Sequence, residues 1–182
     1  MSRTIPIDPI LEKGYNVRLL VKDFDGLINT WSARSEKFRS TVDSSLNCQY
    51  DEGEKNKLDL FRCGKPNAPL YVFVHGGYWQ RGDKSVYSFV AESFVRSGID
   101  VALIGYQLCP ESSMTGIVNQ IRTALIWLWK NAYNYAISKD RINISGHSAG
   151  GHITGMILAT DWQQISSDLP NDLVKTGIPI SG

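Results

Sequence analysis

The chain has 182 residues, of which 42% are hydrophobic and 20% charged, and its formal net charge is +1. This composition is typical of a globular domain with a sizeable core, and it excludes an intrinsically disordered chain. There is no basic surplus to attract nucleic acid or an anionic membrane, so we expect a small molecule as the partner.

The amino-terminal residues do not resemble a secretory signal, because no long apolar run follows Arg3. No apolar run approaches the about 18 residues that a membrane span needs. Cys48, Cys63 and Cys109 are widely spaced and lie outside any CxxC pattern, which favours free thiols. These features predict a cytoplasmic location, and the sequence suggests neither a metal nor a cofactor.

Strands and helices are expected to alternate through most of the chain. Residues 1–56 are predicted to form a helical and loop segment, with a helix at 28–39. After it, strands are expected at 57–62, 70–75, 99–106, 141–145 and 177–181, and helices at 85–98, at 117–137 and after Ser148. The first strand alternates as a half-exposed strand does, whereas the later strands are apolar enough to be buried on both faces.

This alternation indicates βαβ units, and therefore an α/β fold with a mainly parallel sheet and helices on both faces. We expect a single domain over 1–182, with the sheet core at 57–182. The active site of such a fold lies at the carboxyl ends of the strands.

Residues Gly146 to Gly150 read Gly-His-Ser-Ala-Gly and lie between an apolar strand and a helix. This is the G-x-S-x-G pattern of a nucleophile elbow, in which glycines allow a tight turn that exposes the serine hydroxyl. We therefore predict Ser148 as a catalytic nucleophile, next to a helix amino end that favours negative charge. The alternative is a glycine-rich turn that only packs or binds a phosphate.

The stretch VHGGYWQ at 74–80 follows the first buried strand and is predicted to face the elbow. Its glycines, Gly76 and Gly77, would let the backbone approach an oxyanion. Gly77 and Tyr78 are the expected N–H donors, with Ala149 as the third. The alternative is an ordinary glycine turn.

Two neighbouring side chains have different expected roles. His75 is expected to organise this loop rather than to act as a base. Tyr78 and Trp79 could form one wall of a pocket for a flat substrate, or could simply pack under the loop.

The motifs LDLFR, HGGYWQ, GYQLCPE, GHSAGGH and ATDW, in this order, resemble the α/β-hydrolase superfamily and, more narrowly, the kynurenine formamidase (arylformamidase) family. The resemblance runs from about Tyr15 to the last residue. It implies hydrolysis of N-formyl-L-kynurenine to L-kynurenine and formate in tryptophan catabolism, with Ser148 attacking the formyl carbon. Esterases of the hormone-sensitive-lipase type share several of these motifs, so a carboxylesterase remains an alternative.

The resemblance also implies an acid and a histidine after the nucleophile. No histidine follows the acids that come after Ser148, which are Asp161, Asp168 and Asp172. His147 is expected to point away from the active site, and His152, one helical turn further on, is expected to pack against strands.

We therefore expect the triad partners and the last strands of the sheet to lie beyond Gly182, so that this chain alone is inactive or weak. A catalytically inactive fragment that acts as a binding module is a further alternative, and a homodimer is left open.

Overall fold

A computed structural model of the chain describes residues 6–182. Its centre is a six-stranded sheet with the strand order β1-β2-β4-β3-β5-β6. The neighbouring strands β4, β3, β5 and β6 are parallel to one another. Strand β2 runs antiparallel to both of its neighbours, β1 and β4. The expected mainly parallel sheet is confirmed. The strands are β1 (Ser44–Gln49), β2 (Lys57–Phe61), β3 (Leu70–Val74), β4 (Asp100–Ile104), β5 (Ile142–His147) and β6 (Thr176–Ile180).

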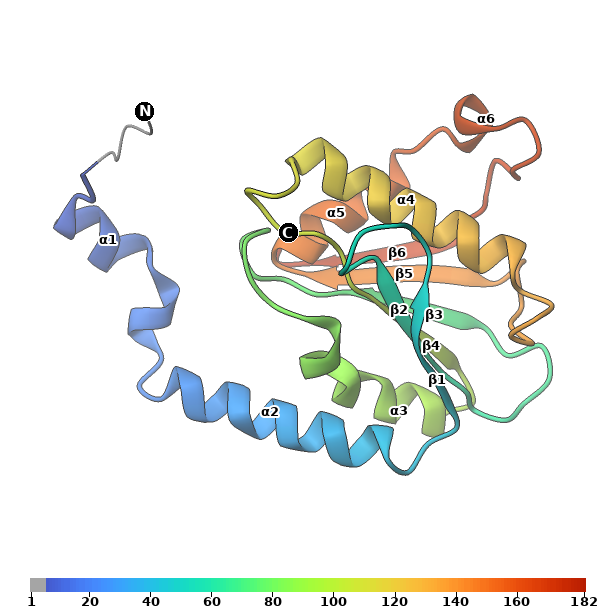
Figure 1. The fold of residues 1–182 in the computed structure, drawn as a ribbon, viewed down its shortest axis with the longest axis horizontal. Coiled ribbons are helices and arrows are strands. Elements are labelled where there is room, and N and C mark those ends of the chain that lie inside the picture. Colours follow the sequence, from blue (N-terminus) through green and yellow to red (C-terminus); the bar gives the residue numbers. More distant parts are fainter. Residues whose placement is uncertain (1–5) are drawn as a thin grey trace.

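Helices cover both faces of this sheet, with α4 and α5 on one face and α2, η2 and α3 on the other (Figure 1). The sheet therefore has a hydrophobic cluster on each face, and successive side chains of β3 enter different clusters. Val72 belongs to the larger cluster, under α4 and α5, and Phe73 belongs to the smaller one, on the opposite face. The helices are α1 (Pro9–Tyr15), η1 (Val17–Leu20), α2 (Phe24–Arg39), η2 (Lys84–Val90), α3 (Ala91–Arg96), α4 (Met114–Lys130), α5 (Ala149–Leu158) and α6 (Trp162–Ile165).

Side-chain caps explain why two helices differ from the expected bounds. Helix α2 begins before residue 28 because the Asp23 side chain accepts a hydrogen bond from the Gly26 N–H. Helix α4 begins at Met114, where the Ser113 side chain caps it. It ends at Lys130, well before residue 137, and the side-chain amide of the next residue, Asn131, donates a hydrogen bond to the Trp127 carbonyl.

The sheet begins earlier than the expected boundary at residue 57, because β1 lies within the segment predicted to be helix and loop. Its sequence, SSLNCQ, has no continuous apolar face, so the pattern gave no strand signal. Strand β1 contains a bulge at which Asn47 has a φ of 57° and its N–H donates to the Asp59 carboxylate at 2.8 Å.

Strand β2 is more buried than its alternating sequence suggests. Asp59 is 1% exposed, and its carboxylate accepts a hydrogen bond from the Lys84 ammonium at 2.6 Å. Lys84 is itself buried and also donates to the Asn47 side chain at 2.8 Å. A buried ion pair therefore joins the start of η2 to the β1–β2 edge of the sheet.

Strand β6 was expected to be buried, and this expectation is wrong for the described chain. It lies at the end of the sheet, next to β5 only, and Ile178 is 61% exposed. Its carboxyl end lies beside the elbow, since the Ile180 carbonyl accepts a hydrogen bond from the Ser148 N–H at 2.8 Å.

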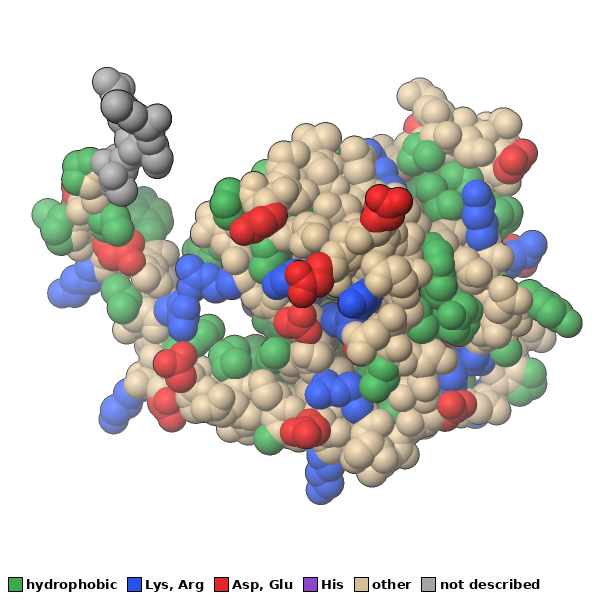
Figure 2. Space-filling model, in the orientation of Figure 1, with side chains coloured by type: hydrophobic (Ala, Val, Ile, Leu, Met, Phe, Trp, Pro, Cys, Tyr) green, Lys and Arg blue, Asp and Glu red, His purple; other side chains and the backbone are tan. Residues whose placement is uncertain are grey.

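Residues 6–21 form an arm that extends away from the sheet (Figure 1). Helix α1 has no buried residue, and hydrophobic side chains such as Ile10 and Tyr15 are exposed along it (Figure 2). None of the helices within residues 6–182 is long and apolar enough to cross a lipid bilayer.

Candidate active site

Ser148 lies between the last residue of β5 and the first residue of α5. Its φ of 57° and ψ of −119° are far from the conformations of both a strand and a helix. Its hydroxyl makes no capping hydrogen bond to α5. The chain therefore reverses within one residue and leaves the Ser148 hydroxyl uncommitted.

Glycines on both sides of Ser148 make this turn sterically possible. A Cβ atom on Gly146 would lie 2.2 Å from the Gly150 carbonyl oxygen, and a Cβ atom on Gly150 would lie 2.1 Å from the Val74 carbonyl oxygen. Both distances are far below van der Waals contact, so this packing of α5 against β3 and β5 requires glycine at both positions.

The predicted oxyanion loop, residues 76–79, adjoins the nucleophile. A Cβ atom on Gly76 would lie 3.1 Å from the Ser148 Cβ and 2.6 Å from the His147 carbonyl oxygen. The next three residues have left-handed backbone, with φ values of 121° at Gly77, 55° at Tyr78 and 56° at Trp79. Such a run is strained for non-glycine residues, which is typical of functional loops.

A turn that closes on itself leaves N–H groups of this loop free. The Gly77 carbonyl accepts hydrogen bonds from the N–H groups of Gln80 and Arg81, both at 3.0 Å. Within residues 6–182, the N–H groups of Gly77 and Tyr78 donate to no other group. Ala149 is the first residue of α5, a position that has no acceptor within its helix. These three N–H groups are therefore available to a developing negative charge.

His75 lies under the loop and is 2% exposed. Its Nδ1 lies 2.8 Å from the Gly76 carbonyl oxygen, and its ring lies nearly parallel to the rings of Tyr106 and Tyr87. Burial lowers the pKa of His75 to about 4. A buried, neutral imidazole bonded to the loop backbone fits an organising role better than that of a base.

The two aromatic residues of the loop lie in different surroundings. Tyr78 is 53% exposed, whereas Trp79 packs against the larger hydrophobic cluster. The Trp79 ring meets the His152 ring edge-on, with the centroids 5.3 Å apart. Trp79 Nε1 and His152 Nδ1 are buried and have no hydrogen-bond partner among the described residues.

No histidine in residues 6–182 makes a hydrogen bond to the Ser148 hydroxyl. The His147 side chain is exposed, as expected from its direction in the turn. Of the later acids, Asp161 caps α6 and Asp172 pairs with Lys175 at 2.6 Å. The structure thus brings together Ser148 and the oxyanion loop, but no acid–histidine pair beside them.

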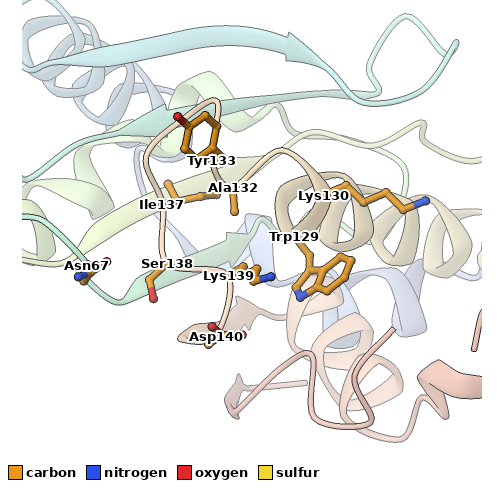
Figure 3. A pocket seen from close by; sticks show the side chains of 9 residues that line it. All are labelled: Asn67, Trp129, Lys130, Ala132, Tyr133, Ile137, Ser138, Lys139 and Asp140. Carbon is orange, nitrogen blue, oxygen red and sulfur yellow. The ribbon is translucent and has the colours of Figure 1, made fainter. Parts of the chain in front are cut away.

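A surface pocket lies near the amino ends of the strands and is separate from this site (Figure 3). Asn67 and Asp140, which line it, precede the amino ends of β3 and β5, whereas Ser148 and the oxyanion loop follow the carboxyl ends of these strands. Because catalytic residues of open α/β sheets gather at the carboxyl ends, this pocket is not part of the candidate active site.

Sequence reasoning missed the contribution of Tyr106. Its hydroxyl donates to the His75 carbonyl at 2.8 Å. The sequence placed Tyr106 at the end of the strand expected at 99–106, whereas β4 ends at Ile104, and no sequence pattern indicated the contact with His75.

Comparison with known families and structures places these features in context. A family model described as BD-FAE matches residues 58–175, which is more than half of the chain. The sequence is 35% identical to a kynurenine formamidase of Salmo salar over 134 residues, which are 72% of this chain and 44% of that protein. It is 30% identical to a kynurenine formamidase of Danio rerio, over 83% of this chain and 52% of that protein. The chain thus spans about half the length of the curated relatives it matches.

A solved structure gives the same picture of the fold. A putative thioesterase of Silicibacter sp. TM1040 superposes with a TM-score of 0.72 and 35% sequence identity. The superposition covers 81% of this chain and 55% of that chain. The matched residues therefore have the fold of about half of that structure.

Proposed function

Because the chain belongs to the BD-FAE family and has the α/β-hydrolase fold, we propose that it acts in a serine hydrolase of the kynurenine formamidase type. The observation that carries the proposal is the conformation of Ser148, which stands in a strained turn beside a loop with free N–H groups. The relatives named kynurenine formamidase support N-formyl-L-kynurenine as the substrate.

In this reaction the Ser148 oxygen attacks the formyl carbon, and the carbonyl oxygen becomes negatively charged. The N–H groups of Gly77, Tyr78 and Ala149 would stabilise that charge. The carbon–nitrogen bond then breaks, the aryl amine leaves with a proton, and water releases formate from Ser148.

The hydroxyl proton of Ser148 needs an acceptor that residues 6–182 do not place beside it. We therefore keep the prediction that the acid and the histidine come from residues outside this chain, and that the chain alone is weak or inactive. High turnover by a preparation whose intact mass shows that the chain ends at Gly182 would contradict this prediction. The cytoplasmic location and the homodimer also stay predictions.

An esterase is the second candidate, because the same nucleophile and N–H groups serve an ester or thioester carbonyl. The solved relative described as a putative thioesterase favours this alternative.

The first test compares N-formylkynurenine and p-nitrophenyl acetate as substrates, alongside labelling by a fluorophosphonate followed by intact mass. Because the described residues place no base beside Ser148, we expect slow labelling that ends at one adduct per chain. Ser148→Ala should abolish this adduct, and Ser97→Ala, which changes an exposed serine far from the site, should retain it. We also expect any turnover to favour the formamide and to fall at least about 1,000-fold in Ser148→Ala.

Each competing function gives a different result. Turnover of the ester alone would replace the formamidase with the esterase. Binding of N-formylkynurenine without labelling or turnover, unchanged in Ser148→Ala, would instead indicate a binding module.

A further inference from the structure

Tyr106 contacts the beginning of the oxyanion loop in two ways. It follows β4 at its carboxyl end and is 1% exposed. Its hydroxyl donates to the His75 carbonyl at 2.8 Å, and its ring stacks on the His75 imidazole with the centroids 4.4 Å apart. Backbone and side chain of His75 are thus both held by one residue from a neighbouring strand.

His75 passes this constraint on to the loop. The Gly76 carbonyl can only accept a hydrogen bond, so the 2.8 Å contact places the imidazole proton on Nδ1. The returning end of the loop closes over this bond, since a Cβ atom on Gly82 would lie 2.8 Å from His75 Nδ1 and 2.9 Å from the Gly76 oxygen. Movement of His75 would therefore displace Gly76 as well.

The far end of the left-handed run is tied to the same segment. The Trp79 carbonyl accepts a hydrogen bond from the Cys109 N–H at 2.7 Å. Tyr106 and Cys109 lie three residues apart after β4, so this short segment holds the residues on both sides of Gly76–Tyr78.

We propose that Tyr106 is a positioning residue of the active site, which holds the oxyanion loop in its left-handed conformation beside Ser148. A strained run such as Gly77–Trp79 persists only where its surroundings over-determine it. At the His75 end, the Tyr106 hydroxyl contributes to this constraint through its hydrogen bond to the His75 carbonyl. The inference rests on the proposed function for its catalytic meaning, but the loop geometry can be tested without it.

The chain offers a matched control in Tyr50. The Tyr50 hydroxyl donates to the Gly105 carbonyl at 2.7 Å and is also buried. Tyr50→Phe and Tyr106→Phe therefore each remove one buried hydroxyl bonded to a backbone carbonyl, and each keeps its ring. Tyr50 makes no hydrogen bond to residues 75–79 within the described chain.

The test is amide hydrogen exchange in the full 182-residue chain, followed by NMR. The reporting amides are those of Gln80 and Arg81, which close the turn on Gly77, and that of Cys109. We expect Tyr106→Phe to speed exchange at these amides about tenfold more than Tyr50→Phe does, at a similar global stability. Equal effects of both variants would reduce Tyr106 to a structural role and overturn the proposal.

Two further measurements complete the test. Replacing Tyr106 by 4-aminophenylalanine restores a donor and should return exchange to the wild-type rate, and failure to do so would count against the hydroxyl. If Tyr106→Phe does not fold, amide exchange of the wild type is measured at increasing denaturant concentration instead. The three amides should then open as one unit, and independent opening would overturn the proposal.

Catalysis provides a separate readout. Where the wild type turns over substrate, Tyr106→Phe should lower kcat about tenfold with little change in KM, because the loop acts on the transition state. A wild type that shows the predicted exchange pattern but forms no fluorophosphonate adduct at Ser148 would count against the proposed function alone. An unchanged kcat and unchanged exchange would overturn this inference alone.

Discussion

The backbone at Ser148 depends on glycines at which no side chain can be accommodated. Gly150 and Gly155 both lie in α5, but their surroundings differ completely. A Cβ atom on Gly150 would lie 2.1 Å from the Val74 carbonyl oxygen, whereas a Cβ atom on Gly155 would have nothing within 4 Å. One helix thus contains a glycine required by packing and another that packing does not require.

This difference predicts opposite effects of the same substitution. Gly150→Ala should destabilise the fold by about 3 kcal/mol or more, because α5 must move away from β3. Gly155→Ala should stabilise it by about 0.5–1 kcal/mol, since alanine favours helix over glycine. Urea unfolding of both variants measures these changes. A tolerated Gly150→Ala would mean that α5 does not approach β3 as described.

His75 gives the molecule a predictable response to pH. Its pKa of about 4 in the folded chain lies below the ordinary value of 6.5, so the unfolded chain binds the proton more readily. Stability linked to His75 is therefore complete above about pH 7 and falls as the pH decreases through 6.5 toward 4. At pH 5 the loss should be about 2 kcal/mol.

Urea unfolding at pH 7, 6 and 5 measures this loss, and an NMR titration follows the imidazole itself. His147→Gln, which changes an exposed histidine, should keep the pH dependence, whereas His75→Gln should flatten it. A His75 imidazole that titrates near 6.5 would contradict the buried, neutral state.

At the scale of the elements, the Lys84–Asp59 pair connects η2 to the edge of the sheet. The side chains are 8% and 2% exposed, so water compensates neither charge. A buried pair adds little net stability, but removing one partner leaves a buried charge without compensation.

Lys84→Met should therefore destabilise the fold by about 3–5 kcal/mol, because the Asp59 carboxylate loses its cation. The double variant Lys84→Met with Asp59→Leu should recover much of that loss. Denaturant midpoints of the two variants make the comparison. A double variant no more stable than Lys84→Met would show that packing, rather than charge, sets the cost.

The sequence predicts some elements better than others for a physical reason. Strands β3 and β4 are covered on both faces, so nearly continuous apolar residues identify them. Strand β1 has few apolar residues and is held by backbone pairing and by the bond from Asn47 to Asp59. Its formation depends on contacts that no local pattern contains.

The candidate site divides in the same way. The elbow at Ser148 could be found because its steric demands act on neighbouring residues and select glycines within the motif. The contact of Tyr106 with His75 could not be found, because it depends on the register of β4 against β3 and on a side-chain direction. Motifs describe local backbone constraints, and the groups that support them come from elsewhere in the fold.

At the scale of the whole molecule, the proposed chemistry gathers at one edge of the sheet. Three segments follow the carboxyl ends of three neighbouring strands, which lie in the order β4-β3-β5. The segment containing Tyr106 follows β4, the oxyanion loop follows β3, and the elbow follows β5. The parallel arrangement alone brings these segments together. This chain, which spans about half of the length of its formamidase relatives, thus contains both the proposed nucleophile and the proposed oxyanion donors.

The edge at β6 also bears on how copies of this chain behave in concentrated solution. The Ile180 carbonyl faces β5, where it accepts the Ser148 N–H, so the backbone groups of the adjacent Pro179 face the open side. Proline has no N–H to donate, which interrupts the row of donors that an incoming strand would use. With a net charge of only +1, mutual repulsion offers little protection against association. Where β6 is the last strand of the sheet, Pro179 therefore leaves an incoming strand one backbone donor short.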